Sequence, residues 1–247
     1  MSGHSKWANI KHRKAKGDAA KASIFTKIGR EIAVCVKQGG PDPNNNNKLK
    51  DVIAKARENN IPNDNIMRSI KKASGEAGGV SYEEITYEGY GPFGVAFYVE
   101  CLTDNKNRSA GDVRHIFDKS GGAMGTTGSV GFMFKRRGVI VADAALYDED
   151  ELMLTALDCG AEDFVSEDGV YLIYTAPQDL STVRERLQNA KIEIISSEID
   201  MIPENSVALN EEDSAKILKM IDRLEENDDV QNVYHNAELT ETDEEEE

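Results

Sequence analysis

The sequence predicts an α+β protein with an N-terminal three-helix bundle followed by two α/β domains, one of them ferredoxin-like (βαββαβ) and inserted in the other. Three observations lead to this prediction. Apolar residues recur with helical spacing until the glycine-rich stretch SGEAGGVS (residues 74–81), after which strand-like runs begin. Residues 138–199 follow the order βαββαβ. One further helix and strand come after them, without strands of their own to pair with.

The first 75 residues predict three amphipathic helices. Asp18 is a suitable N-cap for the first, which should end near Lys37 because the residues GGP follow shortly afterwards. A second helix follows the turn PDPNNNN, and a third starts near Pro62, whose missing N–H is not needed in a first helical turn. The residues expected to face the bundle core are Ile24, Ile28, Ile32, Leu49, Val52, Ile53, Ala56, Ile66, Met67, Ile70 and Ala73.

The next segment predicts the start of a sheet. Strand patterns at 82–88 and 95–102 flank the connection GYGPFG, and a helix is expected at 108–119 with its apolar residues turned inward. A glycine-rich run precedes a strand expected at 130–134. The basic sequence KRRG at 135–138 is interpreted as a junction between domains.

The remaining elements follow a ferredoxin-like order. We expect a strand at 138–142, a helix at 149–158, strands at 163–167 and 170–175, a helix at 179–189 and a strand at 192–199. A last helix at 211–226 and a strand at 230–235 should complete the sheet that begins at Tyr82. The predicted domains are residues 1–77, residues 80–136 with 203–237, residues 137–202, and an acidic tail at 238–247.

Charge is distributed very unevenly along the chain. Residues 1–75 carry sixteen Lys and Arg against six Asp and Glu, a net charge of +10, whereas the other 172 residues have a net charge of −26. The overall net charge of −16 therefore hides a basic module on an acidic body. Such asymmetry predicts a polyanionic partner, above all nucleic acid, at the N-terminal end.

Composition argues against several classes of protein. No run approaches the roughly 18 apolar residues that a membrane-spanning helix needs, and the basic N-terminus lacks the apolar region of a secretory signal. The three cysteines, Cys35, Cys101 and Cys159, are odd in number and form no CxxC pair. They favour a reducing compartment. We therefore expect a cytoplasmic protein with no membrane partner.

Basic residues on the N-terminal arm and on the outer faces of the helices are the predicted contacts to nucleic acid. Lysine and arginine neutralise phosphates and release counterions, which drives binding without sequence readout. Trp7 could stack on an exposed base or, alternatively, pin the arm onto the domain core. The predicted binding residues are Lys6, Trp7, Lys11, Arg13, Lys14, Lys16, Lys27, Arg30, Arg68, Lys71 and Lys72.

Catalytic and metal-binding residues are not predicted. His4 and His12 have no Cys or carboxylate at ligand spacing. Asp112 and His115 could form a general base on one helix, but no nucleophile motif accompanies them, so a surface salt-bridge cluster is the preferred interpretation. We expect no cofactor, no metal and no small-molecule substrate.

Two glycine-rich segments resemble phosphate-binding loops. Gly89, Gly91 and Gly94 satisfy G-x-G-x-x-G, but a strand follows them where the dinucleotide motif requires a helix, so they are interpreted as a hairpin connection. The run at 121–131 could bring backbone close to a phosphate or form a turn before a strand. The sequence leaves both interpretations of the second run open.

Long motifs along the chain resemble the YebC/PmpR family, which includes the mitochondrial translational activator of cytochrome oxidase subunit one. The similar segments are GHSKWANIKHRKAKGDAAKASIFTKIGREI, NIPNDNIMRSIKKASG, YEEITYEGYGPFGVAF, TDNKNR, GGAMGTTGSVGFMF and DDVQNVYHN. The resemblance implies three domains and a cytoplasmic, non-enzymatic transcriptional regulator that binds DNA. Other members act in translation at the ribosome where consecutive prolines stall synthesis. Two expectations follow: a DNA-binding regulator that works with the transcription machinery, or a ribosome-associated factor that binds ribosomal RNA.

Overall fold

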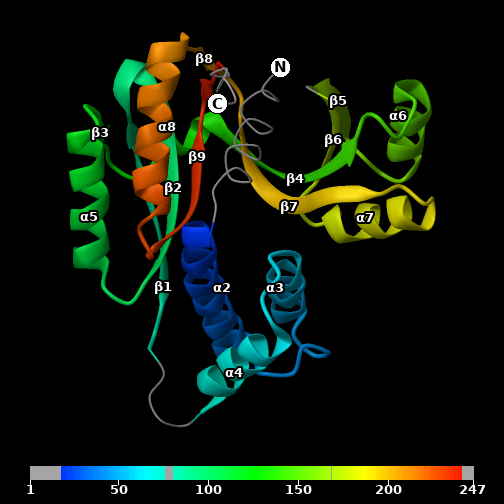
Figure 1. Cartoon of the computed structure of the whole chain (residues 1–247), viewed down its shortest axis with the longest axis horizontal. Helices are drawn as coiled ribbons and strands as arrows, with labels where there is room; N and C mark the ends of the chain where they lie inside the picture. Colours follow the sequence, from blue (N-terminus) through cyan, green and yellow to red (C-terminus); the bar gives the residue numbers. More distant parts are fainter. Residues whose placement is uncertain (1–17, 76–79, 168, 241–247) are drawn as a thin grey trace. The chain divides into compact units, whose positions relative to one another are not determined.

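A computed structural model describes residues 18–75, 80–167 and 169–240 of the chain (Figure 1). The described residues divide into two compact units. One comprises residues 18–129 and 216–233, and the other comprises residues 130–215 and 234–240. Within the described residues, three helices precede two four-stranded sheets, so the predicted α+β class is confirmed.

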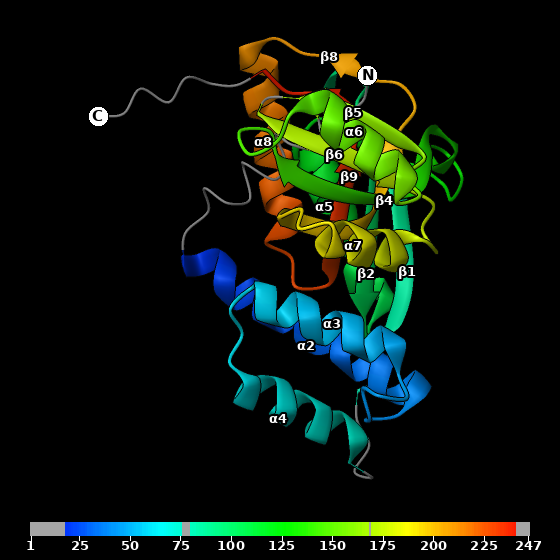
Figure 2. The ribbon, with the colours of Figure 1, turned by 90° about the vertical axis from the view of Figure 1, so that its right-hand side faces the viewer.

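The three helices form the predicted bundle. They are α2 (Asp18–Gly39), α3 (Asn47–Glu58) and α4 (Asn63–Ser74), and α2 packs against both of the others (Figure 2). Their core consists of Ile28, Ile32, Cys35, Val36, Leu49, Ile53, Ala56, Ile61, Ile66 and Ile70. The prediction that Met67 faces this core is wrong, since its side chain is 63% exposed. Ile66 and Ile70 already fill the inner stripe of α4, which leaves Met67 beside it on the helix surface.

A buried asparagine joins α2 to α3. The Asn46 side chain accepts a hydrogen bond from the backbone N–H of Leu49 at 3.1 Å, which caps the start of α3. Its amide nitrogen donates to the carbonyls of Cys35 at 2.8 Å and Gly40 at 2.9 Å. One side chain therefore satisfies backbone groups at the end of one helix and at the start of the next.

The sheet of the same unit has the strand order β3-β1-β2-β9. Its strands are β1 (Glu83–Tyr90), β2 (Ala96–Thr103), β3 (Ala123–Met124) and β9 (Val230–His235), with helices α5 (Lys106–Lys119) and α8 (Glu211–Glu225). Because β9 lies beside β2, the C-terminal strand completes the sheet begun near Tyr82, as predicted. The Phe97 ring on β2 meets Phe117 of α5 edge-on, with ring centroids 5.9 Å apart.

The G-x-G-x-x-G motif lies in the turn between β1 and β2, as the hairpin interpretation predicts. A Cβ at Gly89 would lie 2.5 Å from the Ala123 carbonyl oxygen, so only glycine allows β3 to pack this closely. Gly94, the last residue of the one-turn helix η1 (Pro92–Gly94), adopts a positive φ of 75°. The geometry of a hairpin therefore explains these glycines.

The second glycine-rich run packs against β1. The backbone N–H of Gly128 donates to the Glu88 carboxylate at 2.7 Å, and that of Gly125 donates to the Glu88 carbonyl at 2.8 Å. A Cβ at Gly122 would lie 2.4 Å from the Tyr90 carbonyl oxygen. These contacts favour a structural turn, because two N–H groups of the run bond to a strand residue.

The second unit has the predicted ferredoxin-like order. Its elements are β4 (Phe134–Asp143), α6 (Glu149–Asp158), β5 (Asp163–Glu167), β6 (Val170–Thr175), α7 (Leu180–Asn189) and β7 (Ile194–Pro203). The sheet order is β5-β6-β4-β7, with antiparallel neighbours throughout. Ile140 and Ile173 pack with Val183 and Leu187 of α7 in one apolar core. A short parallel pair, β8 (Val207–Ala208) and β10 (Ala237–Glu238), also belongs to this unit.

The structure differs from two sequence-based expectations around residues 130–138. A 3₁₀ turn, η2 (Gly131–Met133), replaces the strand expected at 130–134, and KRRG lies within the continuous strand β4. Gly138, the last residue of KRRG, lies inside this strand. A Cβ there would lie 2.2 Å from the Thr175 hydroxyl oxygen, so this glycine marks close packing inside a sheet.

Candidate nucleic-acid interface

Six of the residues predicted to bind nucleic acid lie outside the described residues. They are Lys6, Trp7, Lys11, Arg13, Lys14 and Lys16, all on the N-terminal arm. Their role stays a prediction that depends on charge alone: residues 1–17 carry five Lys and Arg and no acidic residue. The alternatives for Trp7, stacking or pinning, stay open as well.

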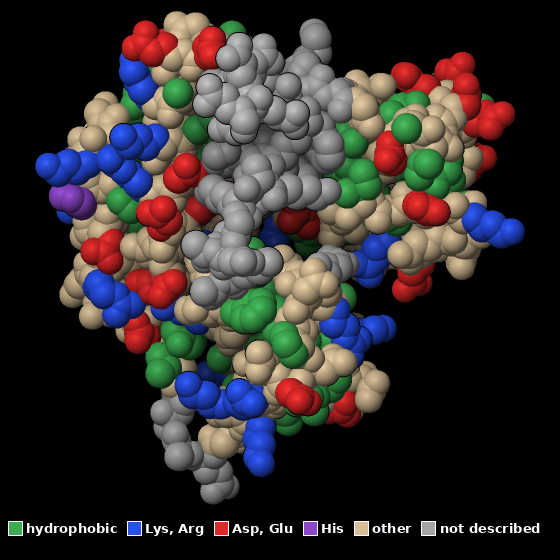
Figure 3. All heavy atoms as spheres, in the orientation of Figure 1, with side chains coloured by type: hydrophobic (Ala, Val, Ile, Leu, Met, Phe, Trp, Pro, Cys, Tyr) green, Lys and Arg blue, Asp and Glu red, His purple; other side chains and the backbone are tan. Residues whose placement is uncertain are grey.

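Helix α4 presents the clearest basic surface among the described residues. Arg68, Lys71 and Lys72 are all exposed, while Ile66 and Ile70 are buried on the other side of the helix. Residues three and four apart share one helix face, so these three cations form a single row, which we call the α4 row. Figure 3 shows Lys and Arg side chains over α4. The α4 row could contact successive phosphates of a nucleic acid.

The two predicted binding residues on α2 make different contacts. The Lys27 ammonium donates to the carbonyl oxygen of Glu225, the last residue of α8, at 2.7 Å. The Arg30 guanidinium donates to the Leu102 carbonyl at 3.0 Å and to the Asp229 carboxylate at 2.5 Å. Lys27 therefore contacts α8 of its own unit, while Arg30 contacts strand β2 and Asp229, and the Arg30 side chain is only 14% exposed.

Asp229 is the centre of this polar cluster. Its carboxylate, 4% exposed, accepts hydrogen bonds from Arg30, from Arg108 at 2.8 Å and from the Thr103 hydroxyl at 2.9 Å. Burial alone would raise the pKa of Asp229, but hydrogen bonds from Arg108, Arg30 and Thr103 outweigh it and hold the pKa below its ordinary value. The carboxylate is thus ionised near neutral pH and neutralises charge on two arginines.

No local pattern in the sequence points to Asp229 or to the contacts of Arg30. The two residues are 199 positions apart, so no local spacing could indicate that they meet. One feature of the sequence is compatible with these contacts: Lys27 and Arg30 lie three residues apart and so share one face of the helix. A helix face with two cations can bind acceptor groups of the protein as well as phosphates.

Other basic residues of the bundle were not predicted to bind. Lys48 and Lys50 on α3 are exposed, and Lys55 forms an ion pair with Glu31 at 2.7 Å. Because α3 mixes charges of both signs, its basic residues fit a solvated surface as well as an interface.

The other candidate sites gain no further support from the described part of the chain. Asp112 and His115 are exposed on α5. Across residues 18–75, 80–167 and 169–240, no group of three His, Cys, Asp or Glu side chains is placed to hold a metal ion. Over the same ranges, every helix is too short or too polar to cross a membrane.

Residues 5–76 match the family described as the TACO1/YebC protein N-terminal domain, and residues 82–237 match the TACO1/YebC second and third domain. The chain belongs to the TACO1/YebC family. A relative from Acetivibrio thermocellus is 59% identical over 238 residues, covering 96% of this chain and 98% of the relative, and is named "Probable transcriptional regulatory protein".

Further similar proteins agree with membership of the TACO1/YebC family. A relative from Clostridium botulinum strain Okra carries the same name and is 59% identical over 242 residues, with 98% of both chains covered. The crystal structure of a conserved hypothetical protein from Aquifex aeolicus is 42% identical and has a TM-score of 0.84. It covers 98% of this chain and 100% of that protein. The family assignment predicted from the motifs is therefore confirmed.

Proposed function

We propose that the protein is a non-enzymatic cytoplasmic regulator that binds DNA through its basic N-terminal part and acts on transcription. The observation that carries the proposal is the α4 row, Arg68, Lys71 and Lys72, exposed on a helix whose other face is buried in the bundle core. The names of the bacterial relatives support a regulatory role. The ferredoxin-like domain is acidic and would repel a nucleic acid, which leaves it free to contact protein partners such as the transcription machinery.

The arm adds charge to the same contact. Its five basic residues directly precede α2, and Lys71 and Lys72 lie in the last turn of α4. Phosphate contacts of this kind fix the position of a protein on DNA without reading its sequence. The basic module, residues 1–75, therefore contributes affinity for DNA and does not select particular bases.

Crosslinking in living cells tests the proposed target. The protein is irradiated with ultraviolet light in its host, purified under denaturing conditions, and the attached nucleic acid is sequenced. Enrichment of promoter DNA is the expected outcome, and recovery of ribosomal RNA would overturn the transcriptional proposal in favour of the ribosome-associated alternative.

A matched pair of variants makes this test specific to the α4 row. Lys71→Glu with Lys72→Glu reverses two of its charges, whereas Arg114→Glu with Lys119→Glu makes the same charge change on exposed residues of α5. The first pair should reduce recovered nucleic acid sharply and the second pair should not. Equal recovery from both would mean that α4 is not the contact surface.

A further inference from the structure

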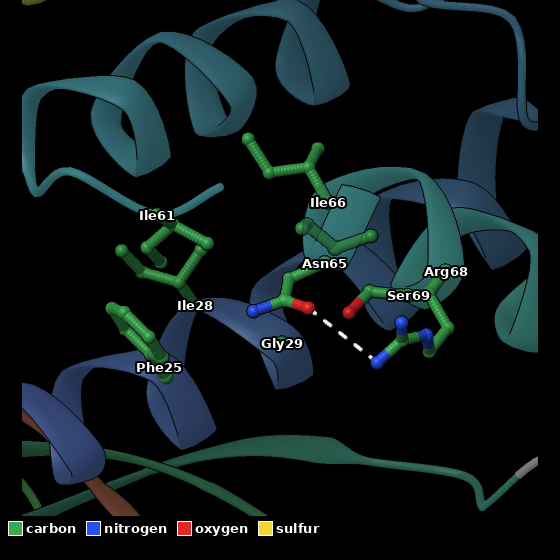
Figure 4. Close-up of a pocket in the computed structure, with 9 residues that line it drawn as sticks. Phe25, Ile28, Gly29, Ile61, Asn65, Ile66, Arg68 and Ser69 are labelled. Atoms are coloured by element: carbon green, nitrogen blue, oxygen red, sulfur yellow. Dashed lines mark hydrogen bonds between the residues drawn. The ribbon is translucent and has the colours of Figure 1, made fainter. Parts of the chain in front are cut away.

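A hollow of about 280 Å³ opens between α2 and α4 of the bundle (Figure 4). Its floor is apolar: Ile28, Ile32 and Ile66 are each only 2% exposed. Phe25 stands on one wall and is 36% exposed, so part of its ring is open to a ligand. The hollow thus offers an apolar floor and an aromatic ring to a small ligand from outside.

The rim of the hollow next to α4 is polar. Asn65, Arg68 and Ser69 line it. The Asn65 amide lies across the hollow, with its oxygen turned to Arg68 and its nitrogen toward the side of Phe25 (Figure 4). The hydrogen bond from Arg68 to the Asn65 oxygen is 3.4 Å long, beyond the usual range of 2.7–3.2 Å, so a ligand could replace it at small cost.

This combination of groups matches one class of ligand. A nucleobase has apolar faces that stack on aromatic rings and edges that both donate and accept hydrogen bonds. An amide offers both a donor and an acceptor, and a hydroxyl does the same. An apolar protein side chain would use the floor but offer no hydrogen bond to the Asn65 amide nitrogen or the Ser69 hydroxyl.

The α4 row places positive charge beside the hollow. Arg68 belongs to both, and Lys72 lies one helical turn further along α4. A base that enters the hollow would therefore bring its flanking phosphates toward lysine and arginine side chains. Bases within a duplex have their faces covered by neighbouring pairs, so only an unpaired base could enter.

We propose that the hollow between α2 and α4 binds one unpaired nucleobase, with Phe25 against its face, Asn65 and Ser69 at its edge, and the α4 row on the adjacent phosphates. This inference rests on the proposed function, because it takes the α4 row as a nucleic-acid contact. It adds the class of substrate: a segment with at least one unpaired base, in DNA or in RNA.

Gly29 makes a clean test of the proposal possible. It lines the hollow, and a Cβ added there would have no atom within 4 Å, so a larger side chain can occupy the space. Glycine is a poor helix former, by about 1 kcal/mol relative to alanine, so Gly29→Leu should leave the melting temperature equal or higher. Gly111→Leu is the matched control, because Gly111 is also a helical glycine with no atom near its Cβ position, on α5.

Binding is measured by fluorescence anisotropy with the full-length protein and three labelled probes: oligothymidine, oligouridine and a DNA duplex. Gly29→Leu should weaken binding to the single strands about tenfold, equal to about 1.4 kcal/mol, which lies within the range for stacking of one base. Duplex binding should stay unchanged, and Gly111→Leu should change neither. Phe25→Ala, at an exposed position, should reproduce the loss without filling the hollow.

The outcomes separate this inference from the proposed function. If Gly29→Leu and Phe25→Ala bind single strands as well as the wild type, while reversal of the α4 row weakens every probe, the hollow is not a base site and the proposed function stands. If reversal of the α4 row has no effect on any probe, the proposed function itself fails.

An equal loss of duplex binding in Gly29→Leu would also overturn the inference. Loss with both single strands supports base recognition, and loss with oligouridine alone supports it with RNA as the substrate.

Discussion

Asp229, just before strand β9, accepts a hydrogen bond at 2.5 Å from Arg30 of helix α2. The same carboxylate binds Arg108 at the start of α5, so it links a helix of the bundle to the sheet and helix of the same unit. Arg30 adds a bond to the Leu102 carbonyl and lies over the Tyr82 ring, 5.4 Å from its centroid. Arg30, which was predicted to contact phosphate, thus links helix α2 to the sheet.

Replacement of Asp229 by asparagine should destabilise this unit strongly. Removal of one partner from a buried ion pair leaves the other charge uncompensated, so we expect Asp229→Asn to lower the free energy of unfolding by about 3 kcal/mol. Asp228→Asn is the matched control, since Asp228 is exposed and loses the same charge. It should change stability by less than about 0.5 kcal/mol. Urea unfolding followed by circular dichroism measures both, and equal effects would contradict a structural role for Asp229.

The contribution of Asp229 should also depend on pH. Its pKa in the folded protein lies below the ordinary value of about 3.9 expected in the unfolded chain. The stabilisation is therefore complete above the unfolded pKa and is lost as the pH falls through the folded pKa. The difference in unfolding free energy between wild type and Asp229→Asn should be constant from pH 7 to about pH 5 and shrink below about pH 4. A difference that stays the same down to pH 3 would disprove the linkage.

Local signals in the sequence were sufficient for most of the elements. Three elements occur where they were predicted: the helix at 149–158 and the strands at 163–167 and 170–175. In each case a short segment of clear periodicity lies between turns that are rich in glycine or acidic residues. The hairpin was also foreseen, since a strand after the G-x-G-x-x-G motif excludes the dinucleotide geometry.

Long-range packing explains what the sequence could not predict. The segment KRRG at 135–138 was interpreted as a junction, yet the place of Gly138 in the sheet depends on Thr175 of a neighbouring strand. The two α2 cations looked equivalent to those of α4, and only their contacts within the fold, from Lys27 to Glu225 and from Arg30 to Asp229, separate them. In both cases the deciding partner lies far away in sequence, so no local pattern carries the information.

Gly89 should tolerate no side chain. A Cβ there would lie 2.5 Å from the Ala123 carbonyl oxygen and 2.8 Å from the Phe117 ring. Overpacking of this kind costs about 1–3 kcal/mol, so Gly89→Ala should lower the melting temperature. Gly111→Ala serves as the control and should raise it slightly, because that glycine lies in a helix with open space around it. If Gly89→Ala is as stable as the wild type, the glycine motif is not required for hairpin packing.

A charge in the bundle core should unfold the bundle. Ile53 is 8% exposed and lies in the core of the three helices. An aspartate there would be neither hydrated nor paired, so we expect Ile53→Asp to remove the cooperative unfolding transition of the bundle. Lys50→Asp places the same residue on the exposed surface of the same helix and should preserve that transition. Circular dichroism at 222 nm during a thermal melt distinguishes the two.

Binding of duplex DNA should be steeply dependent on salt. If about six phosphates are neutralised, the logarithm of the binding constant should fall with the logarithm of salt concentration with a slope of about −5. A wild-type slope shallower than about −2 would mean that the basic module is not the contact surface. Lys71→Glu with Lys72→Glu should weaken binding and reduce the steepness of the slope by about 2, since each lost phosphate contact removes about 1.

The arm makes a separate contribution that the same titration can isolate. Reversal of Lys11, Arg13, Lys14 and Lys16 to glutamate should abolish binding, because these four residues carry most of the positive charge of residues 1–17. The arm has no apolar stripe, so the helical signal and the melting temperature should match the wild type. Arg114→Glu with Lys119→Glu makes half of this change in overall charge on exposed residues of α5 and should retain most of the affinity. Loss of both binding and the cooperative melt in the arm variant would make the arm a structural element and contradict its assignment as a phosphate contact.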